Sequence, residues 1–343
     1  MKPVFVTPPV PAERGRGFNG FIRRLGQILM TPSVAAIVLA IILFMLSGLL
    51  PNGFNNASQA VRQGLNILRL AVFLGVIAAG QTLVIISGGE GIDLSAGAVV
   101  TLSAIVFYSI IDGRDSMLIP GLLVGLSVGA AIGALNGIGI ALLKIAPLVM
   151  TLGMAGVVEG LILVVTQGVL DGGTAPLMNR VINRPVIFNI PGAIIIWLIL
   201  GLLMWVLLER TGYGKRLFAI GTNRITARLS GVNVPATVIL TYALAGMLAA
   251  FGGFMLVGFT QMVFLNLGTP YLFPAIAAVA VGGTLLSGGK GSYFGTMSGA
   301  VVLTLLTSLL TTMQLPESVK QMVLGATLLI LISIYGRQRG LRL

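Results

Sequence analysis

Long apolar runs separated by short polar segments follow one another along most of this chain. Ten of them have the length, about 17–25 residues, that a helix needs to cross the hydrocarbon core of a bilayer. They cover residues 33–50, 66–87, 95–111, 118–143, 145–167, 191–208, 236–258, 271–287, 293–313 and 319–336. The run 95–111 is short, and 271–287 is interrupted by Pro274 and Gly282. The pattern predicts an all-α integral membrane protein with about ten transmembrane helices.

Composition supports the same class and excludes several others. Of the 343 residues 56% are hydrophobic and 9% are charged, whereas a soluble domain carries about 25% charged residues. The chain has no Cys and no His, which excludes disulfides, thiol nucleophiles, cysteine zinc sites and His-dependent catalysis. It also lacks the GxxxxGK[ST] phosphate loop, so we expect it neither to hydrolyse ATP nor to hold a cofactor or metal of its own.

The distribution of basic residues predicts the orientation in the membrane. Lys and Arg lie in the short segments between runs, as topology signals do, and form no nucleic-acid-binding face. Ten crossings put both termini on one side, which receives 15 of the 21 basic residues and is therefore expected to be cytoplasmic. We predict an N-terminal tail at 1–32, a transmembrane domain at 33–336 and a C-terminal tail at 337–343. Because polar residues precede the first run, we expect it to be an uncleaved anchor.

Glycine recurs at every fourth position in the fourth run. The five residues are Gly121, Gly125, Gly129, Gly133 and Gly137. In a helix this spacing makes a smooth face that the backbone of another helix can approach closely. Gly291, Gly295 and Gly299 start a similar comb near the ninth run, which would cross in the opposite direction. The two combs suggest halves related by an inverted repeat, as in many transporters; the alternative is that such combs arise wherever membrane helices pack.

A second internal similarity joins SGGEG at 87–91 to SGGKG at 287–291. Both segments are predicted on the same side of the membrane, and an inverted repeat would not pair them. We interpret this similarity as chance or shared turn chemistry.

Four polar side chains inside or beside the runs are candidates for a translocation path. Gln81 and Asn136 lie within runs, where the alternative role is a hydrogen bond between helices. Glu159 lies in the middle of a run, where a carboxylate indicates a function or a contact with another subunit. Asp93 precedes the third run, and its carboxylate is suited to capping that helix. Two tryptophans, at 197 and 205, are expected at the interface or facing lipid.

The most basic internal connection is residues 209–235, between the sixth and seventh runs. Local sequence signals predict a short helix in it. Asn223 is suited to be the N-cap, residues 224–229 form about two turns, and Gly231 ends the helix. Ile225 and Leu229 then lie on one face. The segment is either a solvated loop that fixes topology or a docking site for a cytoplasmic partner. The residues of the predicted docking site are Gly221, Asn223, Ile225, Ala227, Arg228, Leu229, Ser230 and Gly231.

Four segments in this order resemble bacterial ABC sugar-importer permeases of the ribose, xylose and galactose type. They are GGEGIDLSAG at 88–97, KIAPLVMTLG at 144–153, ERTGYGKRLFAIGTNRITARLSGV at 209–232 and GGTLLSGGKGSYFGTMSGA at 282–300. The resemblance covers about residues 60–336. The chain departs from the family pattern by two extra residues around Glu90, by Ala146 in place of a Pro, and conservatively at Lys215 and Thr226.

The resemblance implies a permease domain at 33–336 with the fold of the type II importers, such as the cobalamin permease, and a coupling loop at 209–235. It implies a pore made with a second permease subunit, identical or paralogous, in the bacterial inner membrane among membrane lipids. ATP and Mg would be bound by separate ATP-binding cassette subunits, and a periplasmic sugar-binding protein would deliver a monosaccharide or similar small polyol.

Two other classes compete with this interpretation. A secondary transporter coupled to protons or sodium would use Glu159 and Asp93 as its coupling carboxylates, but it would not need a coupling loop. A membrane-embedded enzyme is disfavoured by the lack of His and of paired carboxylates on one helix.

Overall fold

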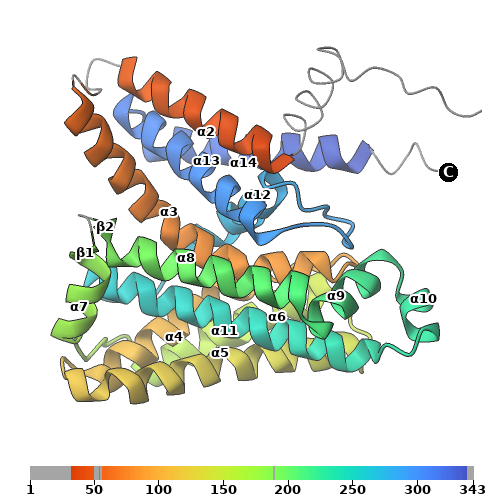
Figure 1. Ribbon diagram of the computed structural model, residues 1–343. Coiled ribbons are helices and arrows are strands. Elements are labelled where there is room, and N and C mark those ends of the chain that lie inside the picture. The colour runs from red at the N-terminus through yellow and green to blue at the C-terminus, as the bar shows by residue number, and fades with distance from the viewer. Residues whose placement is uncertain (1–31, 50–53, 55, 188–189, 338–343) are drawn as a thin grey trace, which may run out of the picture.

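The computed structural model describes residues 32–49, 54, 56–187 and 190–337 (Figure 1). Of the predicted tails at 1–32 and 337–343, residues 1–31 and 338–343 lie outside this part. The described residues are mainly helical. The α-helices are α2 Pro32–Leu49, α3 Ala57–Ile86, α4 Ala96–Ile111, α5 Leu118–Ala141, α6 Pro147–Thr166, α7 Pro176–Asn183, α8 Gly192–Trp205, α9 Gly212–Thr222, α10 Arg224–Leu229, α11 Val234–Thr260, α12 Leu272–Val281, α13 Tyr293–Thr312 and α14 Glu317–Arg337. The described part also contains two short 3-10 helices, a π-helix and an antiparallel strand pair. These are η1 Asp115–Met117, η3 Thr269–Tyr271, the π-helix η2 Val206–Arg210, and the strands β1 Pro185–Ile187 and β2 Ile190–Pro191.

Every apolar run predicted from the sequence overlaps a helix. Six helical segments in the described part are long and apolar enough to cross a membrane, namely Ala57–Ile86, Asp115–Ala141, Pro147–Thr166, Gly192–Arg210, Val234–Thr260 and Tyr293–Thr312. Three further apolar helices, Val34–Leu49, Ala96–Ile111 and Thr269–Val281, are shorter. The protein is therefore a multi-pass, helical membrane protein, while the number of ten crossings stays a prediction.

Two helix boundaries differ from the predicted ones for local reasons. Helix α3 begins at Ala57, nine residues before the predicted run, because the side chain of Asn56 accepts a hydrogen bond from the backbone N–H of Gln59 and caps a polar first turn. Helix α12 ends at Val281, six residues early. Gly283 follows with φ +85°, in the left-handed region that ends helices.

Helix α11 forms the centre of the bundle, packed against α5, α3 and α4, while α13 packs against α3, α2 and α12. Helices α9 and α10 project at one end of the bundle, and α7 with the strand pair lies at the opposite end (Figure 1). We call these the α9–α10 end and the α7 end. Trp197 of α8 is buried rather than lipid-facing, as its Nε1 donates a hydrogen bond of 3.0 Å to Tyr293 Oη in α13.

Two connections turn back into the bundle instead of staying at its ends. Residues 87–95 follow α3 and run back along it, because Gln81 Nε2 donates to the carbonyl oxygen of Asp93. Residues 261–271 follow α11 and return until the Gly268 N–H donates to Thr101 Oγ1 of α4 at 2.9 Å. We call 87–95 and 261–271 the returning segments. The second returning segment packs on the start of α4, where Gly97 and Gly268 lie backbone against backbone: a Cβ on Gly97 would lie 3.2 Å from the Gly268 carbonyl oxygen.

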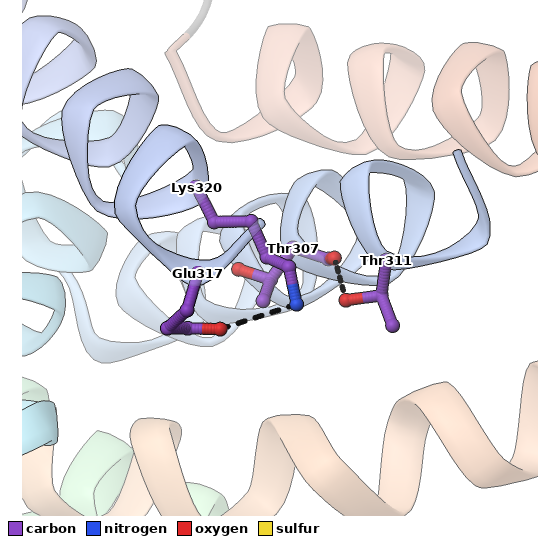
Figure 2. Close-up of polar contacts among 4 residues, drawn as sticks. All are labelled: Thr307, Thr311, Glu317 and Lys320. Carbon is purple, nitrogen blue, oxygen red and sulfur yellow. Dashed lines mark hydrogen bonds and ion pairs between the residues drawn. The ribbon is translucent and has the colours of Figure 1, made fainter. Parts of the chain in front are cut away.

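Helices α13 and α14 are joined by a tight turn with local polar contacts (Figure 2). Lys320 Nζ pairs with a Glu317 carboxylate oxygen at 3.1 Å, one turn apart on α14. Thr311 Oγ1 donates to the carbonyl oxygen of Thr307 at 2.8 Å, so this hydroxyl is satisfied within α13. Satisfying hydroxyls within the same helix is what a low-dielectric surrounding demands.

Candidate functional site

Helix α10 is a short helix defined at both ends by its own sequence. Asn223 Oδ1 accepts hydrogen bonds from the backbone N–H groups of Ile225 and Thr226, at 2.9 and 3.0 Å. At the other end Gly231 has φ +81°. Its N–H bonds to the Arg228 carbonyl, and the next residue's N–H bonds to the Ala227 carbonyl, both at 3.0 Å. This is the Schellman arrangement, which only glycine adopts without strain. Local chemistry therefore forms α10 without a long apolar face.

The two large apolar side chains of α10 point away from the protein. Ile225 is 74% exposed and Leu229 84% exposed, while Ala227 between them is buried against the bundle. Arg228 and Ser230 are also exposed. A helix that turns its small residue inward and its large apolar residues outward presents a surface suited to another protein.

A junction of glycines fixes α9 and α10 to the bundle. Its members are Gly88, Gly221, Gly288 and Gly289. A Cβ on Gly221 would collide with the Ile86 carbonyl oxygen at the end of α3, and would lie 2.9 Å from Gly289 Cα. Gly88 and Gly288 pack against each other with φ +68° and +87°. The similar segments SGGEG and SGGKG are therefore in contact, and each uses glycines with positive φ at this point.

Two side chains extend this anchorage. Arg224 Nη2, at the start of α10, donates to the Gly88 carbonyl oxygen at 3.2 Å and so bonds to the first returning segment. Tyr213 Oη in α9 lies 3.0 Å from Thr241 Oγ1 in α11. Burial raises the pKa of Tyr213 to about 12, so this phenol keeps its proton at neutral pH. The segment that carries α10 thus contacts both the first returning segment and the central helix.

Three of the four polar path candidates belong to one buried network. Asp93 Oδ1 accepts from the backbone N–H of Ser95 at 2.9 Å and from its hydroxyl at 2.6 Å. Asn136 Nδ2 of α5 donates to the same hydroxyl oxygen at 2.9 Å, and Gln81 of α3 bonds to the backbone of Asp93. Hydrogen bonds between segments are therefore the role that the geometry gives Gln81 and Asn136. Asp93 binds the residue before α4 and does not cap that helix directly, which corrects the predicted role.

Sequence reasoning missed three residues that bond to the first returning segment or lie within it. They are Ser95, which joins Asp93 to Asn136; Arg224, which bonds to Gly88; and Thr151 of α6. The Thr151 hydroxyl accepts from the Leu94 N–H at 3.1 Å and lies 3.2 Å from the Ile92 carbonyl oxygen, which fastens α6 to the first returning segment. Short polar residues of this kind are common in membrane helices, so only the extra polar residues around Glu90 could have indicated a special segment.

Glu159 lies apart from the network. Its side chain is exposed on α6, and no hydrogen bond or ion pair joins it to the described residues. The neighbouring Gly156 and Gly160 have open space where a Cβ would be. This face of α6 is available to something outside the described chain.

The glycine comb of α5 faces other helices throughout its length. Gly121 and Gly125 lie against the end of α4, where Cβ atoms would meet Ile111 and Phe107. Gly129, Gly133 and Gly137 lie against the backbone of α11. In the ninth run, Gly299 lies in the same way against the Ala278 carbonyl of α12. The close approach of backbones explains why side chains are missing at these positions.

Comparison with known proteins places this architecture among permeases. The profile of the family described as the permease component of branched-chain amino acid transport systems matches residues 64–332. The ribose import permease RbsC of Bacillus subtilis is 36% identical over 317 residues, covering 92% of this chain and 93% of the relative. RbsC of Escherichia coli K12 is 35% identical, with 86% and 90% covered.

A third relative is named for the import of a different sugar. The galactose/methyl galactoside import permease MglC of Salmonella typhimurium is 32% identical, with 70% of this chain and 76% of the relative covered. No solved structure matches the chain. The agreement over most of the chain, together with the multi-pass helical fold, shows that the protein belongs to this family of transport-system permeases, a class of importer subunit and not of secondary transporters.

Proposed function

We propose that this protein is the membrane-spanning subunit of an ATP-driven importer for a monosaccharide or similar small polyol in the bacterial inner membrane. Relatives named for ribose and galactose import support the substrate class. The sequence offers no phosphate loop, so ATP and Mg are bound by a partner subunit. The permease itself is no enzyme: it converts the movement of that partner into access for the substrate.

The observation that carries the proposal is the exposed pair Ile225 and Leu229 on a helix that is held rigidly. The caps at Asn223 and Gly231 fix the shape of α10, and the glycine junction fixes its position on the bundle. Binding energy at interfaces is concentrated in a few buried apolar anchors. We infer that Ile225 and Leu229 insert into a groove of the ATP-binding cassette subunit, with Arg228 and Ser230 at the rim.

The wider architecture is proposed as ten crossings in two halves related by an inverted repeat, with both termini cytoplasmic. Two matched units support it: α3, the segment 87–95 and α4; and α11, the segment 261–271 and α12. Each is a long helix, a returning segment and a short helix. Their contact at Gly97 and Gly268 is reciprocal, since each glycine would meet the other's carbonyl oxygen if it carried a Cβ. Discontinuous helices at a repeat interface are typical of transporters.

Two further partners follow from the ends and faces that remain free. The α7 end exposes Arg180 and Arg184 and is proposed to receive the periplasmic sugar-binding protein. We propose that the open face of α6 around Glu159 meets the second permease subunit across the pore, because an ionised Glu159 that faced lipid would be energetically costly.

The test is assembly with the ATPase subunit. Leu229→Asp replaces an exposed anchor by a charge, so we expect the ATPase subunit to be lost on co-purification and substrate-stimulated ATP hydrolysis to fall by tenfold or more. Leu177→Asp is the matched control, because Leu177 is an exposed leucine on a short helix at the opposite end. It should retain the ATPase subunit. Equal retention in the two variants would exclude α10 as the docking site.

A further inference from the structure

An apolar groove of about 350 Å³ opens on the side of the bundle between α5, α8 and α11. It is lined by Leu126, Ile196, Ile199, Leu200, Leu203, Met247, Leu248 and Phe251. All three helices belong to segments that are long and apolar enough to span a membrane, so the groove lies within the hydrocarbon region. Its lining residue Leu203, which is 59% exposed, lies on the outward stripe of α8.

Basic side chains lie beyond the groove, towards the α9–α10 end. The outward stripe of α8 continues through η2 to the exposed Arg210, and α9 adds the exposed Lys215 and Arg216. None of the three forms an ion pair with a described residue, and Glu209 is the exposed acid beside them. The Arg210 guanidinium lies over the ring of Trp205, 4.9 Å from its centroid. A tryptophan with cations beside it is the combination found at the level of lipid head groups.

We propose that this groove and the basic cluster Arg210, Lys215 and Arg216 form a binding site for one anionic phospholipid. An acyl chain lies in the groove, and the phosphate lies against the basic cluster beside Trp205. Leu203 and Arg210 are seven residues apart, which is about 10 Å along a helix axis. The glycerol and ester groups of a phospholipid span this separation between the first methylenes and the phosphate.

Charge complementarity favours a lipid over a second copy of this chain. Two copies meeting through this groove about an axis along the membrane normal would form an isologous contact, which brings the same surface of both subunits together. The basic clusters would then face each other at the same depth, and like charges oppose such an interface. An anionic head group instead neutralises the cluster.

The wild-type protein provides a direct test, because it contains only two tryptophans. Trp197 is buried, and Trp205 lies beside the proposed head-group position. The purified full chain is placed in nanodiscs of phosphatidylcholine that contain 5% brominated phosphatidylglycerol or 5% brominated phosphatidylcholine. We expect at least threefold more quenching of tryptophan emission by the anionic lipid. Equal quenching by the two lipids overturns the proposal.

Matched variants separate the two parts of the site. Leu203→Trp fills the groove, while Leu202→Trp adds the same ring at a neighbouring exposed position that does not line it. We expect native mass spectrometry to show one retained phosphatidylglycerol in wild type and Leu202→Trp, and at least fivefold less in Leu203→Trp. Equal retention in the two variants overturns the groove as the acyl-chain site.

The head-group test replaces Arg210, Lys215 and Arg216 together by Gln. The control replaces Arg62, Arg180 and Arg184 by Gln, which removes the same charge from other parts of the chain. We expect the first triple variant to lose the preference for phosphatidylglycerol and the control to keep it. Equal effects would mean that net charge, and not this cluster, selects the lipid. Cross-linking of two copies through the variant Leu203→Cys would show instead that another permease covers the groove. Because the wild-type quenching needs no substitution, misfolding of a variant leaves the proposal testable.

Discussion

The backbone N–H of Gly289 donates a hydrogen bond of 2.9 Å to the carbonyl oxygen of Ile86, the last residue of α3. This bond joins the turn after α12 to the end of a helix that lies about 200 positions earlier in the sequence. Gly221 of α9 packs into the same point. A displacement of α9 and α10 by a docked partner would therefore act directly on the end of α3 and on the turn after α12. Through Gly88 it would also act on the first returning segment.

The junction should be intolerant of even one methyl group. In Gly221→Ala the new Cβ would collide with the Ile86 carbonyl oxygen, so α9 must shift away. Overpacking of this kind costs about 1–3 kcal/mol. We expect a lower unfolding temperature of the purified protein and weaker coupling of ATP hydrolysis to uptake. Gly212→Ala is the control, since a Cβ there has open space, and it should unfold like wild type. Two equally stable and equally coupled variants would contradict the importance of the junction.

The sequence predicts the helices well because bilayer thickness sets the length of an apolar run, and α10 because its caps are local signals. It does not predict the returning segments. The hydropathy of an apolar run gives the length of a helix, but it does not show whether the connection after that helix re-enters the bundle. Contact between 87–91 and 287–291 depends on tertiary packing that neither segment encodes alone. Helix α6 is apolar on nearly all sides, so no periodicity revealed that Glu159 faces outward. Trp197 is buried because Gly75 leaves room for its ring, a pairing across helices that is invisible in either segment.

The comb of α5 predicts a second steric test. In Gly129→Leu the side chain would enter α11, where a Cβ already meets the Gly246 carbonyl and lies 2.6 Å from Ala250 Cβ. We expect a loss of stability of about 1–3 kcal/mol or more, or failure to assemble. Ala131→Leu is the control, as it enlarges an exposed position on the same helix. Thermal unfolding in detergent should separate the two. Wild-type stability of Gly129→Leu would show that α5 and α11 do not pack as described.

The network at Asp93 predicts different effects for two substitutions at one position. Asp93→Ala leaves the buried N–H and hydroxyl of Ser95 without their acceptor, at a cost of about 1–3 kcal/mol for each orphaned donor. Asp93→Asn keeps an oxygen at the same place, so it should be clearly more stable than Asp93→Ala and still transport. Glu90→Gln, an exposed change in the same segment, should resemble wild type. A stable Asp93→Asn protein that no longer transports would instead assign the carboxylate to the translocation path.

Glu159 gives the test that separates an ATP-driven importer from an ion-coupled carrier. An ionised carboxylate in the middle of a bilayer costs roughly 2.5–3.5 kcal/mol on insertion scales for the comparable Asp. Since Glu159 is exposed on α6 and bonds to no described residue, we expect it to face water or the second subunit. An importer driven by ATP does not cycle a proton there.

Glu159→Gln keeps the shape of the side chain and most of its hydrogen bonding. ATP-dependent uptake should therefore remain above about half of wild type when the variant is reconstituted with its ATPase and binding protein. Proteoliposomes that contain the permease alone should show no uptake when only a proton gradient is imposed. Gradient-driven uptake by the wild type that disappears in Glu159→Gln would identify Glu159 as a coupling carboxylate and reject the importer.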